Sequence, residues 1–149
     1  MKTNSGKKGE GMPVVRNPQF YFREGLCWSD INTTFLKCRK KQKSINDVKS
    51  MSVYSNCELT PNDLIIGIIN STLISYYVDT FVNNTQTFQI NDARQLPIVI
   101  PSSSILESIC GITKLGVECK INKPQNEEDK LYYIQSNLDK VINELYGIN

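Results

Sequence analysis

The densest group of chemically versatile side chains lies between residues 81 and 101, where six carboxamides occur: Asn83, Asn84, Gln86, Gln89, Asn91 and Gln95. A carboxamide presents a hydrogen-bond donor and an acceptor side by side, which suits the edges of DNA bases. Asn83, Asn84 and Gln86 are therefore candidate DNA contacts. Turn formation is the alternative for Asn83 and Asn84, because Asn often occupies loop positions with positive φ. For Gln89, which stands between two apolar residues, we expect a structural hydrogen bond.

A basic run forms the second candidate site. Five of the seven residues from position 37 to 43 are cationic: Lys37, Arg39, Lys40, Lys41 and Lys43. Their mutual repulsion predicts a loop or the edge of a sheet. Such side chains neutralise phosphates and provide affinity without sequence choice. An ordinary solvated loop is the alternative. We expect this run and the carboxamides to line one groove that admits a double helix.

Two residues upstream invite a similar interpretation. Arg23 is a candidate phosphate contact, and an ion pair with Glu24 is the structural alternative. Trp28 could stack on a base. Because the only Trp of a small domain usually belongs to its core, we expect Trp28 there.

The composition excludes several kinds of chemistry. The chain contains no histidine, which removes Ser-His-Asp and Cys-His catalysis and the commonest metal ligand. None of its five cysteines forms a C-x-x-C pair, so we expect no zinc site and no catalytic residue in this segment. Their odd number and irregular spacing favour reduced thiols in a cytoplasmic protein over a disulfide framework.

The charge is unevenly distributed along the chain. Residues 1–50 contain eleven Lys and Arg against four Asp and Glu, a net +7, whereas residues 51–149 contain six against eleven, a net −5. This asymmetry predicts one surface that faces a polyanion, with an unpartnered basic tail as the alternative. Residues 1–11 are polar and the longest apolar stretch, Leu64–Ile69, is far too short to cross a bilayer, so we expect no membrane partner.

The pattern of apolar residues predicts an α+β fold, with a small mixed β-sheet of short strands packed on a central helix and with C-terminal helices. We expect one domain over residues 13–149, preceded by a mobile basic, glycine-rich segment over residues 1–12. The central helix is expected from Thr60, as its cap, to Phe81, with Gly67 permitting close packing. The other expected elements are strands on both sides of a turn at Gly25 within Tyr21–Ile31, strands at Val48–Tyr54, Phe88–Ile90 and Leu96–Ile100, and helices from Ser102 to Gly111 or Leu115 and from Pro124 until a stop at Gly147.

Four segments resemble one family in the same order. They are Asn17–Ser29, Leu64–Ser71, Phe88–Ile98 and Asn143–Ile148. Together they resemble the C-terminal specificity part of the PglX and type IIG-like adenine-specific DNA methyltransferases, which is related to the TaqI-type specificity domain. The resemblance covers about residues 13–149, and it is loose between Ser29 and Leu64.

The resemblance implies a bacterial restriction–modification or phage-defence system. The parent would transfer a methyl group from S-adenosylmethionine to adenine N6, and this target-recognition domain would choose the DNA sequence. The family's glycine-rich cofactor loop and its Asn-Pro-Pro-Tyr motif do not occur in this sequence, so the resemblance implies a non-catalytic segment without a cofactor of its own. Its expected partners are double-stranded DNA and the parent's catalytic domain. The alternative is a protein-interaction module that docks on a catalytic subunit through the Leu131–Leu145 helix.

Overall fold

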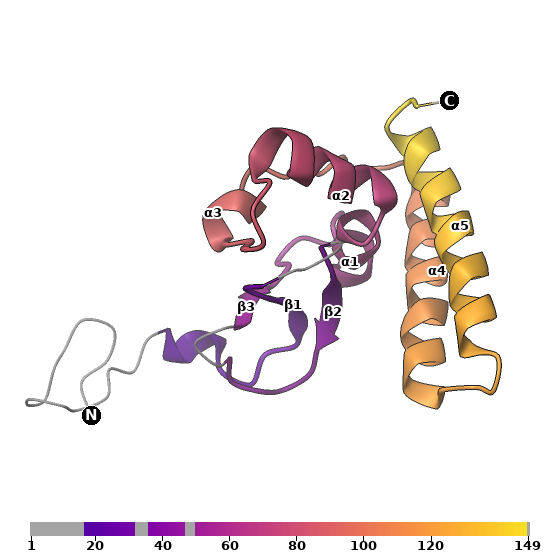
Figure 1. The fold of residues 1–149 in the computed structure, drawn as a ribbon. Helices are drawn as coiled ribbons and strands as arrows, with labels where there is room; N and C mark the ends of the chain where they lie inside the picture. The colour runs from indigo at the N-terminus through magenta and orange to yellow at the C-terminus, as the bar shows by residue number, and fades with distance from the viewer. Residues whose placement is uncertain (1–16, 32–35, 47–49, 149) are drawn as a thin grey trace, which may run out of the picture.

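The computed structural model describes residues 17–31, 36–46 and 50–148. It has the predicted α+β class: a small sheet lies beside a group of short helices, and two long C-terminal helices cover one side (Figure 1). The basic segment over residues 1–12 and the first two residues of the strand expected at Val48–Tyr54 lie outside the described residues.

The sheet has three short strands, β1 (Gly25–Ser29), β2 (Cys38–Lys41) and β3 (Ser50–Val53), in the order β2-β1-β3. Both pairings are antiparallel, whereas a mixed sheet was expected. The basic run therefore lies at a strand edge, which is one of the two predicted positions. Leu26 and Trp28 of the central strand are buried, and alternation places them on the same face of the sheet.

The chain before β1 differs from the prediction. Instead of a strand leading to a turn at Gly25, a 3-10 helix, η1 (Pro18–Phe20), is followed by Phe22 in the left-handed region at φ 57°. Gly25 is the first residue of β1. A Cβ at this position would lie 2.5 Å from the carbonyl oxygen of Val53, so the glycine permits the close approach of β1 and β3.

The predicted central helix is broken in two places. α1 (Asn62–Ile69) and α2 (Thr72–Tyr77) are separate, and a π-helix, η2 (Val78–Val82), follows. The first break occurs because buried Ser71 donates to the carbonyl of Ile68 at 2.7 Å and caps α2 by accepting from the N–H of Ile74 at 3.2 Å. The helix start also shifts: Pro61, not Thr60, occupies the N-cap position.

Two predicted strands are absent from the described residues. A short helix, α3 (Ile90–Ala93), replaces the strand at Phe88–Ile90, and residues 96–100 form no strand. Asp92 favours the helix because its carboxylate accepts the N–H of Gln89 at 2.8 Å. An isolated antiparallel bridge between Thr87 and Ile31 joins this part of the chain to the strand region.

The last two helices form a hairpin. α4 (Ser103–Asn122) is longer than predicted, and α5 (Glu127–Leu145) ends shortly before Gly147, which has φ 67° and so supplies the predicted stop. Figure 1 shows α4 and α5 side by side, with α1 packed against the hairpin.

The core forms where α1 meets the sheet and the hairpin. Trp28 is 1% exposed, which confirms its predicted core position, and its Nε1 donates to the carbonyl of Phe88 at 2.9 Å. Gly67 of α1 faces Ile109 and Thr113 of α4, as the predicted close packing requires. Within the described residues no single helix is long and apolar enough to cross a membrane; only α1 with residues 72–82, bent by 60°, reaches that length and composition as a pair.

Candidate nucleic-acid interface

The structure divides the predicted cations of the basic run between two faces of β2. Arg39 and Lys41 share one face because side chains alternate along a strand, and Lys37, one residue before β2, follows the same alternation. On this face Arg39 lies opposite Cys27, which in turn lies opposite Ser52 of β3. We call this the outer face, because the core residues Leu26 and Trp28 lie on the other one. Lys37 and Arg39 are both exposed.

Lys40 points to the inner side of the sheet. Its Nζ lies 3.9 Å from Oδ1 of Asp63 in the first turn of α1. The Lys40 side chain is 46% exposed, so solvent weakens this ion pair and the ammonium can exchange one anionic partner for another.

Lys41 has a structural environment. It is 3% exposed, and its Nζ donates to the carbonyls of Ser44 at 2.6 Å, Arg23 at 3.1 Å and Gln42 at 3.3 Å. The same ammonium lies 5.6 Å from the centre of the Tyr54 ring. Three carbonyls use all three ammonium donors, so Lys41 holds the segment after β2 to the segment before β1.

Arg23 lies against two aromatic rings. The Cζ atom of its guanidinium is 5.4 Å from the centre of the Phe20 ring and 5.5 Å from that of Tyr54. The two rings stack with centroids 5.3 Å apart. These cation–π contacts fix the side chain, and Arg23 and Lys43 both remain exposed. They extend the basic surface beyond β2.

Asn70 positions the basic strand. Its carboxamide binds both backbone groups of Cys38: Oδ1 accepts the N–H at 2.7 Å, and Nδ2 donates to the carbonyl at 2.8 Å. A side chain thus completes the pairing of an edge strand. The carbonyl of Asn70 accepts a hydrogen bond from Gln135 of α5 at 3.1 Å, so the break between α1 and α2 ties β2 to the helical hairpin.

The carboxamide segment is built mainly as a turn. Nδ2 of Asn83 donates to the carbonyl of Thr87 at 2.8 Å, and its Oδ1 accepts from the N–H of Thr85 at 2.9 Å. This is the turn chemistry named as the alternative for Asn83, although its φ is extended at −161°. Asn84 and Gln86 are exposed. Gln89 precedes α3 and is not part of a strand, and its backbone N–H donates to the carboxylate of Asp92.

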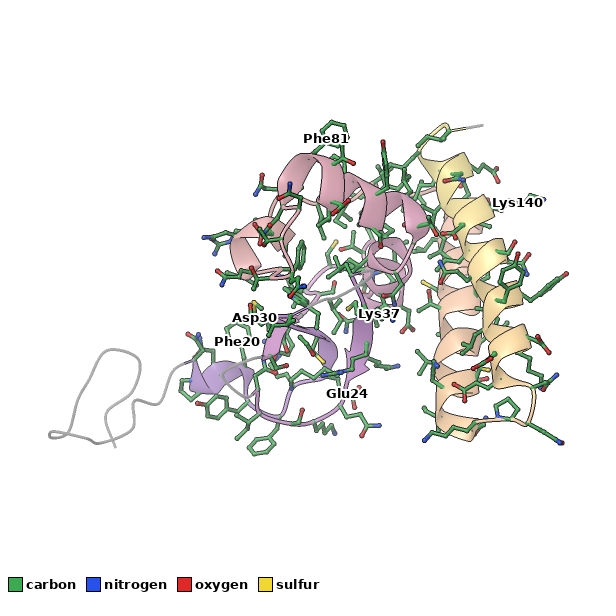
Figure 2. The ribbon with its side chains drawn as sticks, in the orientation of Figure 1. Phe20, Glu24, Asp30, Lys37, Phe81 and Lys140 are labelled. Atoms are coloured by element: carbon green, nitrogen blue, oxygen red, sulfur yellow. The ribbon has the colours of Figure 1, made fainter. Side chains whose placement is uncertain are left out.

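The two predicted segments meet the sheet at one end. Phe88 donates its N–H to the carbonyl of Asp30 at 2.9 Å, so the carboxamide segment lies beyond the C-terminal end of β1. Because β1 and β2 pair antiparallel, β2 begins at this same end, next to Lys37, and runs away from it to Lys41. Figure 2 shows Lys37 on the side of the sheet nearer to α4. Figure 1 places α3, which contains one of the carboxamides, on the side away from the hairpin. The shared groove therefore stays a prediction.

The cysteine environment also depends on the sheet. Cys38 and Cys27 lie on adjacent strands, and both are buried. Burial and the neighbouring Cys27 thiol raise the pKa of Cys38 to about 12. This thiol remains protonated and unreactive at neutral pH.

The comparisons with known proteins bear on this arrangement. No family model and no curated protein matches the chain. A solved structure that is similar is that of the Type IIL restriction–modification enzyme MmeI in complex with DNA, described as having implications for engineering of new specificities. The match has a TM-score of 0.73 and 14% identity, over 91% of this chain. The chain shares its fold with part of a restriction–modification enzyme. It spans about a fifth of the MmeI chain, 20%.

Two residues with important positions escaped the sequence analysis. Asn70 lay inside a predicted continuous helix, where no pattern indicates a strand partner. The second is Phe22, which is 61% exposed and lies between η1 and β1, although the sequence predicts a strand there. The sequence shows that Phe22 precedes Arg23, but nothing in it indicates the positive φ of Phe22.

Proposed function

We propose that this chain is the DNA sequence-recognition part of a restriction–modification methyltransferase. The observation that carries the proposal is the shared fold with MmeI, whose structure holds DNA, over 91% of the chain. The order of the four family-like segments supports adenine N6 as the parent's target. The segment itself carries no catalytic residue in this proposal, and the parent's catalytic domain binds S-adenosylmethionine.

The outer face of β2 supplies the phosphate contacts. Lys37 and Arg39 are exposed there, and Arg23 and Lys43 continue the positive surface at the end of the sheet. On the far side of β1, β3 presents the small polar residues Ser50 and Ser52 on the same face. Asn84 and Gln86 are exposed carboxamides that could contact base edges or phosphates. They lie beyond the C-terminal end of β1 and would meet a different part of the duplex from Arg23 and Lys43.

Salt-dependent binding tests this proposal. The affinity of the purified chain for a fluorescent duplex of mixed sequence is measured at several salt concentrations. Each phosphate contact contributes about 0.9 to the slope of log affinity against log salt. Replacing both Lys37 and Arg39 by Ala should therefore reduce the slope by about 1.8 and weaken binding to every sequence alike.

The matched control is the double change of Lys130 and Lys140 to Ala. Both lysines are exposed on α5, and their loss gives the same change in net charge. The control should leave the slope unchanged. If the wild-type chain ignores duplex DNA even in dilute buffer, or if both double variants change the slope equally, the proposed DNA-binding surface is wrong.

Docking on a catalytic subunit is the second candidate. It is favoured by large exposed apolar side chains on the hairpin, namely Leu115, Ile121, Tyr132 and Tyr133, of which Tyr132 is 79% exposed. A gel shift with random duplex at low and high salt separates the two candidates. A docking module gives little shift at either salt concentration, whereas a DNA-recognition domain gives a shift that salt removes.

A further inference from the structure

The segment between η1 and β1 presents an aromatic ring to solvent at a backbone conformation that bulky residues avoid. Phe22 has φ 57° and is 61% exposed. A non-glycine residue in the left-handed region is strained, and such strain persists only where the surroundings enforce it. Phe20 and Glu24, labelled in Figure 2, mark the two sides of this segment, at the end of the sheet away from α2.

The surroundings of Phe22 enforce its conformation through three contacts. The Phe22 N–H donates to the carbonyl of Ser44 at 3.3 Å. The buried ammonium of Lys41 donates to that same carbonyl and to the carbonyl of Arg23, the next residue. The Arg23 guanidinium in turn lies against the rings of Phe20 and Tyr54. The neighbours of Phe22 are therefore held on both sides, while its own ring is left out of the aromatic cluster.

Its backbone conformation distinguishes Phe22 from the other well-exposed aromatic residues of the described chain, because none of them has a positive φ. These residues are Tyr76, Phe81, Tyr132 and Tyr133. Phe22 stands beside Arg23, with Glu24 one residue further along, and the Ser44 carbonyl that binds its N–H directly follows Lys43. The two cations outnumber the one carboxylate. A rigid apolar tip on a positive surface suits a polyanion whose interior is apolar and stacked.

We propose that Phe22 is a wedge that inserts its ring at a base step of duplex DNA and partly unstacks it. This inference rests on the proposed DNA-recognition function and adds a mechanism to it. Phe is among the side chains that proteins insert between base pairs, and unstacking is offset by the contacts that the bent duplex then makes. The cations around Phe22 bind the phosphates on each side of the step. The strain at Phe22 is maintained because it presents the ring outward.

The test compares two duplexes. One is fully paired and the other has the same mixed sequence with a central mismatch, where the stack is already weakened. A wedge binds the mismatched duplex more tightly because less unstacking remains to be done. We expect the wild-type chain to prefer it by about tenfold, as measured by fluorescence anisotropy. Phe22→Ala and Phe22→Gly should reduce this ratio to about one while leaving the salt dependence unchanged, because no charge is lost.

Phe81→Ala is the matched control, because it removes another exposed ring, 70% exposed, from a different part of the described chain. It should keep the wild-type ratio. Circular dichroism establishes that each variant is folded, and Phe22→Gly provides a variant whose backbone tolerates positive φ. If the wild type binds DNA but shows no preference, or if the Phe22 variants keep the ratio, the wedge is refuted and DNA recognition stands. If the wild type binds neither duplex, the proposed function fails together with the wedge.

Discussion

The contact between α1 and α4 makes a strong prediction about Gly67. A Cβ placed on Gly67 would lie 2.6 Å from Oγ1 of Thr113 and 2.7 Å from Cγ2 of Ile109. Neither neighbour has room to withdraw, because Ile109 is fully buried and Thr113 is 7% exposed. Gly67→Ala therefore forces α1 and α4 apart or pushes these side chains out of their preferred rotamers.

Two opposing effects set the magnitude. Ala is more favourable than Gly in a helix interior by up to about 1 kcal/mol. Overpacking of a close-packed core costs about 1–3 kcal/mol. Overpacking less the gain in helix propensity gives a loss of up to about 2 kcal/mol in the free energy of unfolding for Gly67→Ala, or up to roughly 8 °C in Tm for a chain of this size.

Gly111 in α4 is the matched control. A Cβ there meets no atom within 4 Å, so Gly111→Ala gains helix propensity without a clash and should raise the stability by up to about 1 kcal/mol. Urea unfolding followed by circular dichroism measures both. Thr113→Ala, which removes one clashing atom, should restore part of the loss in the Gly67→Ala background. Equal stabilisation by Gly67→Ala and Gly111→Ala would refute the close packing.

Three further predictions concern the basic surface and its support. Phe22→Gly should be more stable than Phe22→Ala by about 0.5–1 kcal/mol in thermal unfolding. Glycine removes the left-handed backbone strain of about 1–2 kcal/mol, but its greater chain entropy in the unfolded state cancels part of that gain. Equal stabilities of the two variants would contradict the strain. Asn70→Asp should lower the free energy of unfolding by about 1–3 kcal/mol, since a carboxylate would face the Cys38 carbonyl, whereas Asn84→Asp at an exposed site should change it little. The pKa of Cys38 is raised in the folded chain, so its thiol stays protonated there, whereas the thiol of the unfolded chain ionises near the ordinary pKa of 9.0. The contribution of Cys38 to the free energy of unfolding is therefore fully present below pH 9.0 and is lost as the pH rises toward about 12. Between about pH 8 and about pH 10.5 the wild type should lose about 2 kcal/mol more stability than Cys38→Ala in urea titrations, and equal losses would contradict the shifted pKa.

The sequence predicted the features that depend on apolar patterning or on the properties of a single residue type. The α+β class, the core position of Trp28, the close packing at Gly67 and the stop at Gly147 each follow from a pattern that one physical cause dominates. Burial of a large ring and the absence of a Cβ have the same consequences in most contexts. Tertiary contacts therefore did not alter the outcome of these predictions.

The failures have a different cause, because local patterns competed with distant partners. Residues 88–90 alternate like a strand, but Asp92 captures the N–H of Gln89 and starts a helix. The helix predicted over Thr60–Phe81 is broken at Ser71, whose hydroxyl ends one helix and caps the next. The carboxamide of Asn83 could bind a base edge, but its nitrogen and its oxygen both form hydrogen bonds with the backbone of its own turn.

The same competition limits what the basic run predicts about a binding surface. Spacing along the chain does not reveal which side of a strand a cation occupies, and β2 divides its cations between its two faces. Arg39 lies on the outer face, Lys40 reaches Asp63 on α1, and Lys41 is buried among carbonyls. Within this run Lys41 thus supports the fold, while the other cations are exposed. The Lys41 ammonium binds the carbonyl of Arg23, next to Phe22, and the carbonyl of Ser44, which accepts the Phe22 N–H. It therefore couples the end of β2 to the segment that presents the exposed ring, and in the proposed complex a duplex that contacts one would lie within reach of the other.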